Sequence, residues 1–158
     1  MDKSPKKIVA SLTIPPRADK VTIYFDGACS NNGSKDSESG CGAVVIVNDT
    51  VKHNISKYIG RGFTNNQSEY RGLIEGLKLA YQLYPKCDLT CIGDSQLVIK
   101  QMKGEYKCKH PNMIPLHKDA KQISSSFTSV VFQHVLRDKN SAADALANKA
   151  VQLKHYKM

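Results

Sequence analysis

Leu89-Thr90-Cys91-Ile92-Gly93-Asp94-Ser95 sets the architecture of this chain. The apolar run is typical of a buried strand, and the apolar residues that follow Asp94 have helical spacing. This pattern predicts a strand over residues 87–92 that delivers an aspartate carboxylate to the edge of a sheet, where a helix begins. An aspartate in that place is most often only a helix N-cap, so the single residue does not establish a function.

Three strands are predicted before this unit, over residues 21–27, 40–47 and 51–58, where β-branched residues gather between short turns. Three consecutive strands with short turns predict an antiparallel meander. A helix over residues 65–81 follows, with Leu73 and Leu77 at helical spacing and Pro85 beyond its end. Gly72 and Gly76 share the apolar face of this helix and predict that it approaches the sheet closely.

Beyond residue 94 the sequence predicts a helix to about residue 104, a second over 111–124, a strand over 128–136 and an alanine-rich helix over 140–151 with Asn140 as N-cap. The order βββαβααβα predicts an α/β fold, a five-stranded mixed sheet with helices packed on it. The strands over 21–27 and 87–92 are expected to be parallel neighbours. Their carboxyl ends then meet at one edge, where open sheets bind ligands.

The chain has 158 residues and 41% hydrophobic residues, which is enough for one domain with a core. We expect a domain over residues 21–153 between a flexible tail at 1–20 and a short tail at 154–158. The alternative for residues 1–20 is a remnant of an N-terminal module. These residues lack a signal-peptide core, and no apolar run reaches membrane-spanning length, so the prediction is an intracellular protein, cytoplasmic or nuclear.

The net charge is +9, and six lysines fall within residues 98–121. A basic surface attracts polyanions or merely provides solubility, and charge alone does not separate the two. The five cysteines form no C-x-x-C pair and have no histidine at zinc-finger spacing, so reduced structural thiols are expected.

Four carboxylates occupy unfavourable places: Asp26 and Asp94 at strand ends, and Glu69 and Asp144 on the packing faces of two helices. Each alone has an ordinary explanation as a turn, a cap or a satisfied core group. Gathered together they would repel each other, and a hard divalent cation would remove that conflict. Oxygen ligands favour Mg²⁺, with Mn²⁺ as the alternative. Two such ions roughly 3.5–4 Å apart are suited to phosphodiester hydrolysis.

Four motifs resemble the type 1 ribonuclease H family in order and spacing. They are Phe25-Asp26-Gly27-Ala28-Cys29-Ser30-Asn31-Asn32-Gly33, Thr64-Asn65-Asn66-Gln67-Ser68-Glu69, Gly93-Asp94-Ser95, and residues 140–148. The resemblance implies a ribonuclease H fold and endonucleolytic cleavage of the RNA strand of RNA–DNA hybrids, leaving 5′-phosphate and 3′-hydroxyl ends. It also implies two Mg²⁺ ions held by Asp26, Glu69, Asp94 and Asp144.

The resemblance further implies that Asn32, Asn65 and Asn66 contact the minor groove. Amides suit this role because they donate and accept hydrogen bonds and can recognise a 2′-hydroxyl. Turn and cap chemistry explains the same residues, and both explanations can hold. Further candidate substrate contacts are Gly27, Ser95, Lys100 and Lys103.

Two features differ from many bacterial and animal members. The junction before the last helix, residues 136–140, is short and lacks histidine. His134 falls within a predicted strand and is interpreted as structural, which leaves Arg137 as a candidate electrostatic substitute. The chain also lacks tryptophan, and residues 103–110 are too few for the family's basic protrusion, so it resembles the compact form. Substrate affinity is then expected to rest on the N-terminal tail or on Lys100, Lys103, Lys107 and Lys109.

Two other functions stay open from the sequence. One is a nuclease or transposase of the same superfamily that acts on DNA, which the paired asparagines disfavour. The other is a non-catalytic module that binds hybrids, which the complete set of four acidic residues disfavours. The predicted partner is the hybrid, and we expect a monomer without membrane association.

Overall fold

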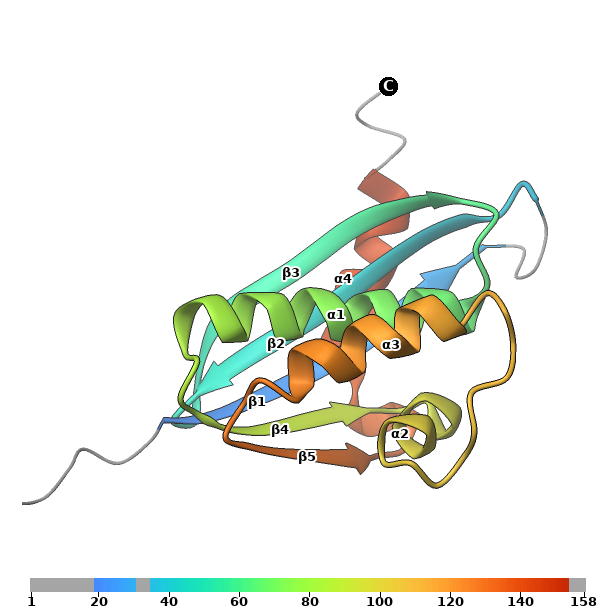
Figure 1. The fold of residues 1–158 in the computed structure, drawn as a ribbon. Coiled ribbons are helices and arrows are strands. Elements are labelled where there is room, and N and C mark those ends of the chain that lie inside the picture. Colours follow the sequence, from blue (N-terminus) through green and yellow to red (C-terminus); the bar gives the residue numbers. More distant parts are fainter. Residues whose placement is uncertain (1–18, 31–34, 154–158) are drawn as a thin grey trace, which may run out of the picture.

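The structure is a computed structural model that describes residues 19–30 and 35–153 (Figure 1). One sheet has the strand order β3-β2-β1-β4-β5. Its strands are β1 Lys20–Cys29, β2 Glu38–Val47, β3 Thr50–Arg61, β4 Asp88–Gly93 and β5 Ser129–His134. β1, β2 and β3 are antiparallel, whereas β4 runs parallel to both β1 and β5. The predicted five-stranded mixed sheet, including the parallel pair, is confirmed.

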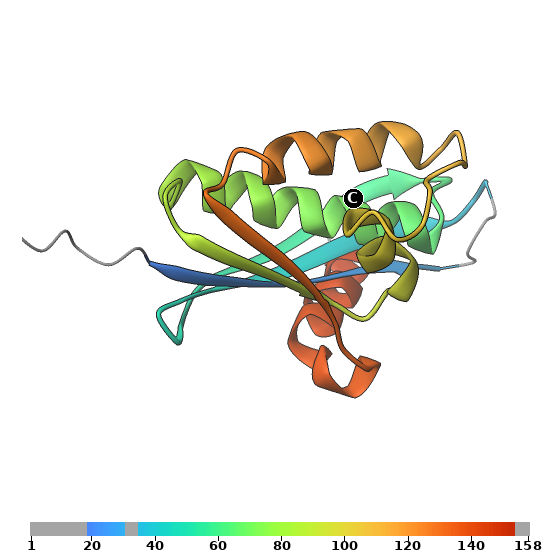
Figure 2. The same ribbon diagram turned by 60° about the horizontal axis from the view of Figure 1, so that its bottom comes forward.

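Four α-helices cover the sheet: α1 Asn65–Leu83, α2 Gln96–Met102, α3 Ile114–Ser124 and α4 Ser141–Leu153. A short 3₁₀ turn, η1 Arg137–Lys139, joins β5 to α4 and is the one described element that the sequence pattern did not predict. α1, α2 and α3 lie on one face of the sheet and α4 on the other (Figures 1 and 2). None of the helices in the described ranges is long and apolar enough to cross a membrane.

The larger core lies between the sheet and the helices α1, α2 and α3. It contains fully buried side chains from both layers, among them Ile23, Phe25, Leu73, Leu77, Leu89 and Ile99. The opposite face is packed differently, because α4 presents small residues, Ala143, Ala147 and Ala150, to the sheet. All five cysteines lie within the described residues and are free thiols, as expected.

Glycines let α1 approach β1 as the sequence predicted. A Cβ atom on Gly72 would lie 2.5 Å from the main-chain oxygen of Asp26, and one on Gly76 would lie 2.7 Å from the Ile23 side chain. A Cβ on Gly27 would overlap the main chain of α1 at Ser68 and Glu69. The first turns of α1 therefore sit directly on the end of β1, next to Asp26.

Candidate active site

Three of the four predicted carboxylates converge at the carboxyl ends of β1 and β4. Phe25 and Gly93 are register partners in this parallel pair, so the residues after them, Asp26 and Asp94, emerge side by side. α1 adds Glu69, which lies above the same edge. One oxygen from each of the three carboxylates lies within 4.8 Å of the others. The sheet register and the close packing of α1 on the sheet thus bring together residues that are distant in the sequence.

The fourth carboxylate, Asp144 of α4, lies in the same pocket but outside this group of three. We call this the carboxylate pocket: a cavity of about 410 Å³ lined by Asp26, Gly27, Ala28, Cys29, Asn65, Glu69, Asp94, Arg137, Asp144 and Asn148. Asn148 donates to the Asp144 carboxylate at 3.2 Å and to its main-chain oxygen at 2.9 Å. An amide one helical turn away therefore orients Asp144.

Burial and mutual repulsion disfavour ionisation of these groups. Asp26 is 3% exposed, and its pKa is raised to about 7, first by burial and then by the charge of Asp94. Burial and the neighbouring Asp26 raise the pKa of Glu69 well above its ordinary value. The Oε2 atom of Glu69 is buried and has no hydrogen-bond partner among the described residues.

This arrangement fits a hard divalent cation. Its ligands are carboxylate oxygens, which are the donors that Mg²⁺ and Mn²⁺ prefer. A bound cation would also supply the missing partner of Glu69 Oε2 and offset the repulsion between the acidic groups. Of the described residues that line the pocket, Arg137 carries the positive charge, and it is exposed rather than packed among the acids.

The amides predicted to contact substrate stand at the start of α1. A capping box holds this end: Gln67 N donates to Thr64 Oγ1 at 3.2 Å, and Thr64 N donates to Gln67 Oε1 at 2.8 Å. The two residues between them, Asn65 and Asn66, are thereby fixed in the first turn. Asn65 lines the carboxylate pocket, and both asparagines line a second cavity beside it.

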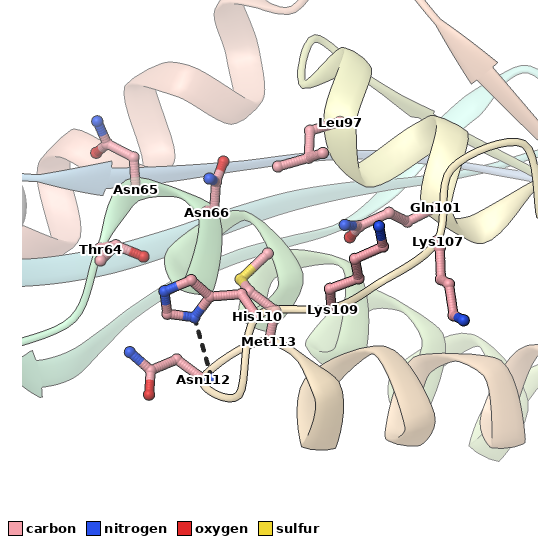
Figure 3. Close-up of a pocket in the computed structure, with 10 residues that line it drawn as sticks. All are labelled: Thr64, Asn65, Asn66, Leu97, Gln101, Lys107, Lys109, His110, Asn112 and Met113. Atoms are coloured by element: carbon pink, nitrogen blue, oxygen red, sulfur yellow. Dashed lines mark hydrogen bonds between the residues drawn. The ribbon is translucent and has the colours of Figure 1, made fainter.

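We call this second cavity the basic groove. It has a volume of about 600 Å³ and lies between the start of α1, the helix α2 and the segment that leads into α3 (Figure 3). Its lining is Thr64, Asn65, Asn66, Leu97, Gln101, Lys107, Lys109, His110, Asn112 and Met113. Two lysines and several amides around an open cavity make it suited to a polyanion with hydrogen-bonding groups.

The remaining predicted substrate residues are placed differently. Lys100 lies over the Tyr106 ring at 4.9 Å, and Lys103 forms an exposed ion pair with Glu105 at 3.5 Å, so neither lines the two cavities. Ser95 accepts a hydrogen bond from Val98 N at 3.2 Å and caps α2. Gly27 N donates to Asp26 Oδ1 at 2.9 Å. Asn32 lies outside the described residues.

Asn140 has a place at the site that the sequence did not predict. It was expected to cap α4, but its amide nitrogen donates to Phe25 O at 2.9 Å and to Asp94 Oδ2 at 3.2 Å. The sequence signals were an asparagine before an alanine-rich helix, which is typical of an ordinary cap, and the first place in the 140–148 motif, and neither assigned it a role at the site. His134 is exposed at the end of β5 and is not among the described residues lining either cavity.

Comparison with known proteins agrees with this geometry. The model of the reverse transcriptase-like family matches residues 24–150. The chain is 36% identical to ribonuclease HI of Halobacterium salinarum over 149 residues, which is 94% of this chain and 72% of that protein. It is 40% identical to a bifunctional protein of Mycobacterium tuberculosis over 84% of this chain, but it spans only 35% of that protein's length.

Solved structures give the same result. The crystal structure of RNase H1 from Halobacterium salinarum superposes with a TM-score of 0.77 at 35% identity, covering 84% of this chain and 98% of that one. LC11-RNase H1, crystallised in complex with an RNA/DNA hybrid, gives a TM-score of 0.78 at 31% identity, covering 85% and 99%. Since a ribonuclease HI is 36% identical over most of both chains and solved RNase H1 structures superpose on this fold, the chain belongs to the ribonuclease H family.

Proposed function

We propose that this chain is a type 1 ribonuclease H of the compact form, which hydrolyses the RNA strand of RNA–DNA hybrids endonucleolytically and leaves 5′-phosphate and 3′-hydroxyl ends. The observation that carries the proposal is the convergence of Asp26, Glu69 and Asp94 within 4.8 Å. Three buried or half-buried carboxylates at this distance have no structural use that would offset their repulsion. A complex of a related protein with an RNA/DNA hybrid supports the choice of substrate.

Asp26, Glu69, Asp94 and Asp144 would hold a pair of Mg²⁺ ions, with Mn²⁺ as the alternative. When bound, the ions supply an activated water and stabilise the leaving alkoxide. The protein's own part is to keep the carboxylates in place before the metal arrives. Gly27 N donates a hydrogen bond to the Asp26 carboxylate, and Asn148 donates one to the Asp144 carboxylate. The capping box fixes the start of α1, the helix that carries Glu69.

Asn65 connects the two cavities, which suggests how a duplex lies on the surface. It lines both the carboxylate pocket and the basic groove, so one strand of a duplex would reach the carboxylates while the other lies along Lys107 and Lys109. Asn65 and Asn66 would then face the minor groove between the strands. Their amides can donate to and accept from a 2′-hydroxyl, which is the group that distinguishes RNA from DNA. Asn32 is proposed for the same role on the resemblance alone.

Arg137 is proposed as the residue that acts where many relatives have a loop histidine. It is exposed at the rim of the carboxylate pocket, on η1, and its guanidinium is permanently charged. From this position it would attract the phosphate of the strand to be cut and stabilise negative charge that develops during hydrolysis.

A cleavage assay on matched duplexes tests the proposal. Labelled RNA–DNA hybrid, double-stranded DNA and double-stranded RNA of one sequence are incubated with the chain in Mg²⁺ or in excess EDTA. We expect cleavage of the RNA strand of the hybrid in Mg²⁺ alone, with 5′-phosphate ends on the products. Cleavage of the double-stranded DNA instead would assign the chain to the DNA-cutting nucleases of this fold.

Asp94→Asn is the matched variant, because the amide keeps the size of the side chain and removes its charge. It should abolish cleavage while the folded protein still binds the hybrid. Full activity in this variant, or activity of the wild type in EDTA, would contradict the proposed mechanism. Asp138→Asn serves as the control, since Asp138 is an exposed aspartate outside the described lining of the pocket.

A further inference from the structure

Asn140 lies between η1 and α4 and is 1% exposed. Its amide nitrogen donates two hydrogen bonds to different segments: one to the main-chain oxygen of Phe25 in β1 at 2.9 Å and one to Oδ2 of Asp94, which follows β4, at 3.2 Å. Phe25 immediately precedes Asp26. A single amide therefore links β1, at the point where its pairing with β4 ends, to the residue that follows β4, and two of the three converging carboxylates lie there.

The orientation of this amide follows from the chemistry of its partners. A main-chain carbonyl and a carboxylate only accept hydrogen bonds, so the NH₂ group has to face them, and the flipped amide would place Oδ1 against two acceptors. Oδ1 is consequently buried with no hydrogen-bond partner in the described part of the chain. A helix N-cap needs the opposite arrangement, an oxygen that accepts from the first turn. The position of Asn140 is therefore explained by the two hydrogen bonds that its amide nitrogen donates, and not by capping of α4.

The donated bond restrains one specific carboxylate. Because Asn140 holds Oδ2 of Asp94, the carboxylate cannot rotate freely, and Oδ1 is left without that bond. Asp94 is also the residue whose charge contributes to the raised pKa of Asp26. Carboxylates that bind metals are commonly oriented by a neighbouring hydrogen-bond partner of this kind, and losing the partner weakens metal binding.

We propose that Asn140 is a positioning residue for the metal centre, holding the Asp94 carboxylate in the orientation that faces Asp26 and Glu69. The inference rests on the proposed function, since it takes the metal site from there. Asn140 acts through Asp94 and touches neither the cation nor the substrate. It also fastens α4 to the sheet, so the experiment has to separate positioning from anchoring.

Ser56 gives a matched control for anchoring. Its hydroxyl donates to Leu146 O at 2.7 Å and so ties β3 to α4, away from the carboxylates. Mn²⁺ binding is measured by titration calorimetry on the full chain without nucleic acid, for the wild type, Asn140→Ala and Ser56→Ala. We expect Asn140→Ala to weaken Mn²⁺ binding by about tenfold or more, and Ser56→Ala to leave it within about twofold.

Two further measurements accompany the titration. Hybrid binding in EDTA should be unchanged in Asn140→Ala, because the duplex surface is intact. The cleavage rate of this variant should recover as the Mn²⁺ concentration is raised, which a general loss of structure would not allow. Circular dichroism and urea unfolding report whether each variant folds, and Asn140→Ser, which keeps a shorter donor, replaces the alanine variant if that one is unfolded.

The outcomes are distinguishable. A folded Asn140 variant with wild-type Mn²⁺ affinity overturns the inference, and so do equal losses in Asn140→Ala and Ser56→Ala, which would leave anchoring as the only role. A wild-type chain that binds no Mn²⁺ overturns the metal centre of the proposed function, and the positioning role falls with it. Weaker Mn²⁺ binding in Asn140→Ala alone, with a cleavage rate that recovers at higher Mn²⁺ concentration, supports the assignment.

Discussion

Gly72 of α1 faces the main-chain oxygen of Asp26 so closely that a Cβ atom at position 72 would lie 2.5 Å from it. The same Cβ would lie 3.0 Å from the main-chain oxygen of Gly42 on β2. Neither neighbour is a flexible side chain that can move aside. The absence of a side chain at Gly72 therefore sets how closely α1, and with it Glu69, approaches β1 and β2 beside Asp26.

Gly72→Ala should destabilise the protein and reduce cleavage. Alanine normally favours a helix over glycine by about 1 kcal/mol, but here the added methyl group has to push α1 away from the sheet, at a cost of about 1–3 kcal/mol. Urea unfolding in EDTA measures the change in free energy of unfolding. Lys78→Ala, an exposed substitution in the same helix, should change it by less than about 0.5 kcal/mol. A Gly72→Ala protein more stable than wild type would refute the packing argument.

The raised pKa of Asp26 predicts how pH affects stability without metal. In the folded chain the pKa of Asp26 is raised to about 7 from its ordinary value of 3.8, so the folded state binds more protons than the unfolded state between these values. Its contribution to stability is therefore fully present at low pH and is lost as the pH rises toward 7. The free energy of unfolding in EDTA should fall over this range in the wild type.

Asp26→Asn removes the part of this dependence that Asp26 contributes, while buried Glu69, whose pKa is also raised, keeps its own part. One pKa unit corresponds to about 1.4 kcal/mol, so in EDTA at pH 8 the variant should be more stable than the wild type by at least about that amount. Added Mg²⁺ should stabilise the wild type more at pH 8 than at pH 6, because protons compete with the cation, and it should stabilise Asp26→Asn little. Parallel pH profiles for wild type and variant would show that Asp26 ionises normally.

Arg137→Ala should lower the cleavage rate without changing the fold. Its guanidinium lines the carboxylate pocket and is exposed, so an interaction of about 1 kcal/mol is reasonable, which corresponds to about a fivefold loss in kcat. Arg137→Lys should retain most of the rate. Lys139→Ala removes an exposed charge from the same turn but outside the described lining of the pocket. An equal loss of cleavage rate in that variant would show that the overall charge matters and the position of Arg137 does not.

The structure divides the four lysines that were predicted to bind substrate. Lys107 and Lys109 line the basic groove, whereas Lys100 lies over Tyr106 and Lys103 pairs with Glu105. Replacing Lys107 and Lys109 with glutamine should weaken hybrid binding and reduce its salt slope by about 0.9 per lost phosphate contact. Lys100→Gln with Lys103→Gln should have the smaller effect.

Filter binding over a range of salt concentrations measures both slopes. A control pair, Lys52→Gln with Lys78→Gln, changes the net charge equally at exposed positions of β3 and α1. If the control pair flattens the slope as much as Lys107 and Lys109 do, the affinity depends on total charge and not on the groove.

Local sequence patterns were sufficient for the elements and for much of the site. The alternation in β1 and the heptad-like spacing in α1 are properties of neighbouring residues, and so the order βββαβααβα followed from them. Glu69 was identifiable because a charge lies on the apolar face of a predicted helix. Asp94 was identifiable because a charge directly follows a buried strand. The 3₁₀ turn η1 escaped prediction, since its three residues carry no periodic signal.

Asn140 and Ser95 illustrate the limit of such patterns. Both precede a helix, and both fit the residue preferences of an N-cap equally well. Ser95 does cap its helix, with an accepted bond of 3.2 Å, whereas Asn140 turns its amide to Phe25 and Asp94. The residues that decide between these roles lie 46 or more positions away, and no local pattern contains them.

The sequence by itself determined the chemistry of this protein: which side chains carry negative charge, which strands and helices hold them, and that their clustering would need a cation. The tertiary structure alone decided the distances. It brought Asp26, Glu69 and Asp94 within 4.8 Å, placed Asp144 in the lining of the same pocket and gave Asn65 a place in the lining of both cavities. The reason is that the strand register and the close packing of α1 on the sheet, which its glycines allow, depend on contacts between distant segments. Those contacts exist only once the whole sheet has formed.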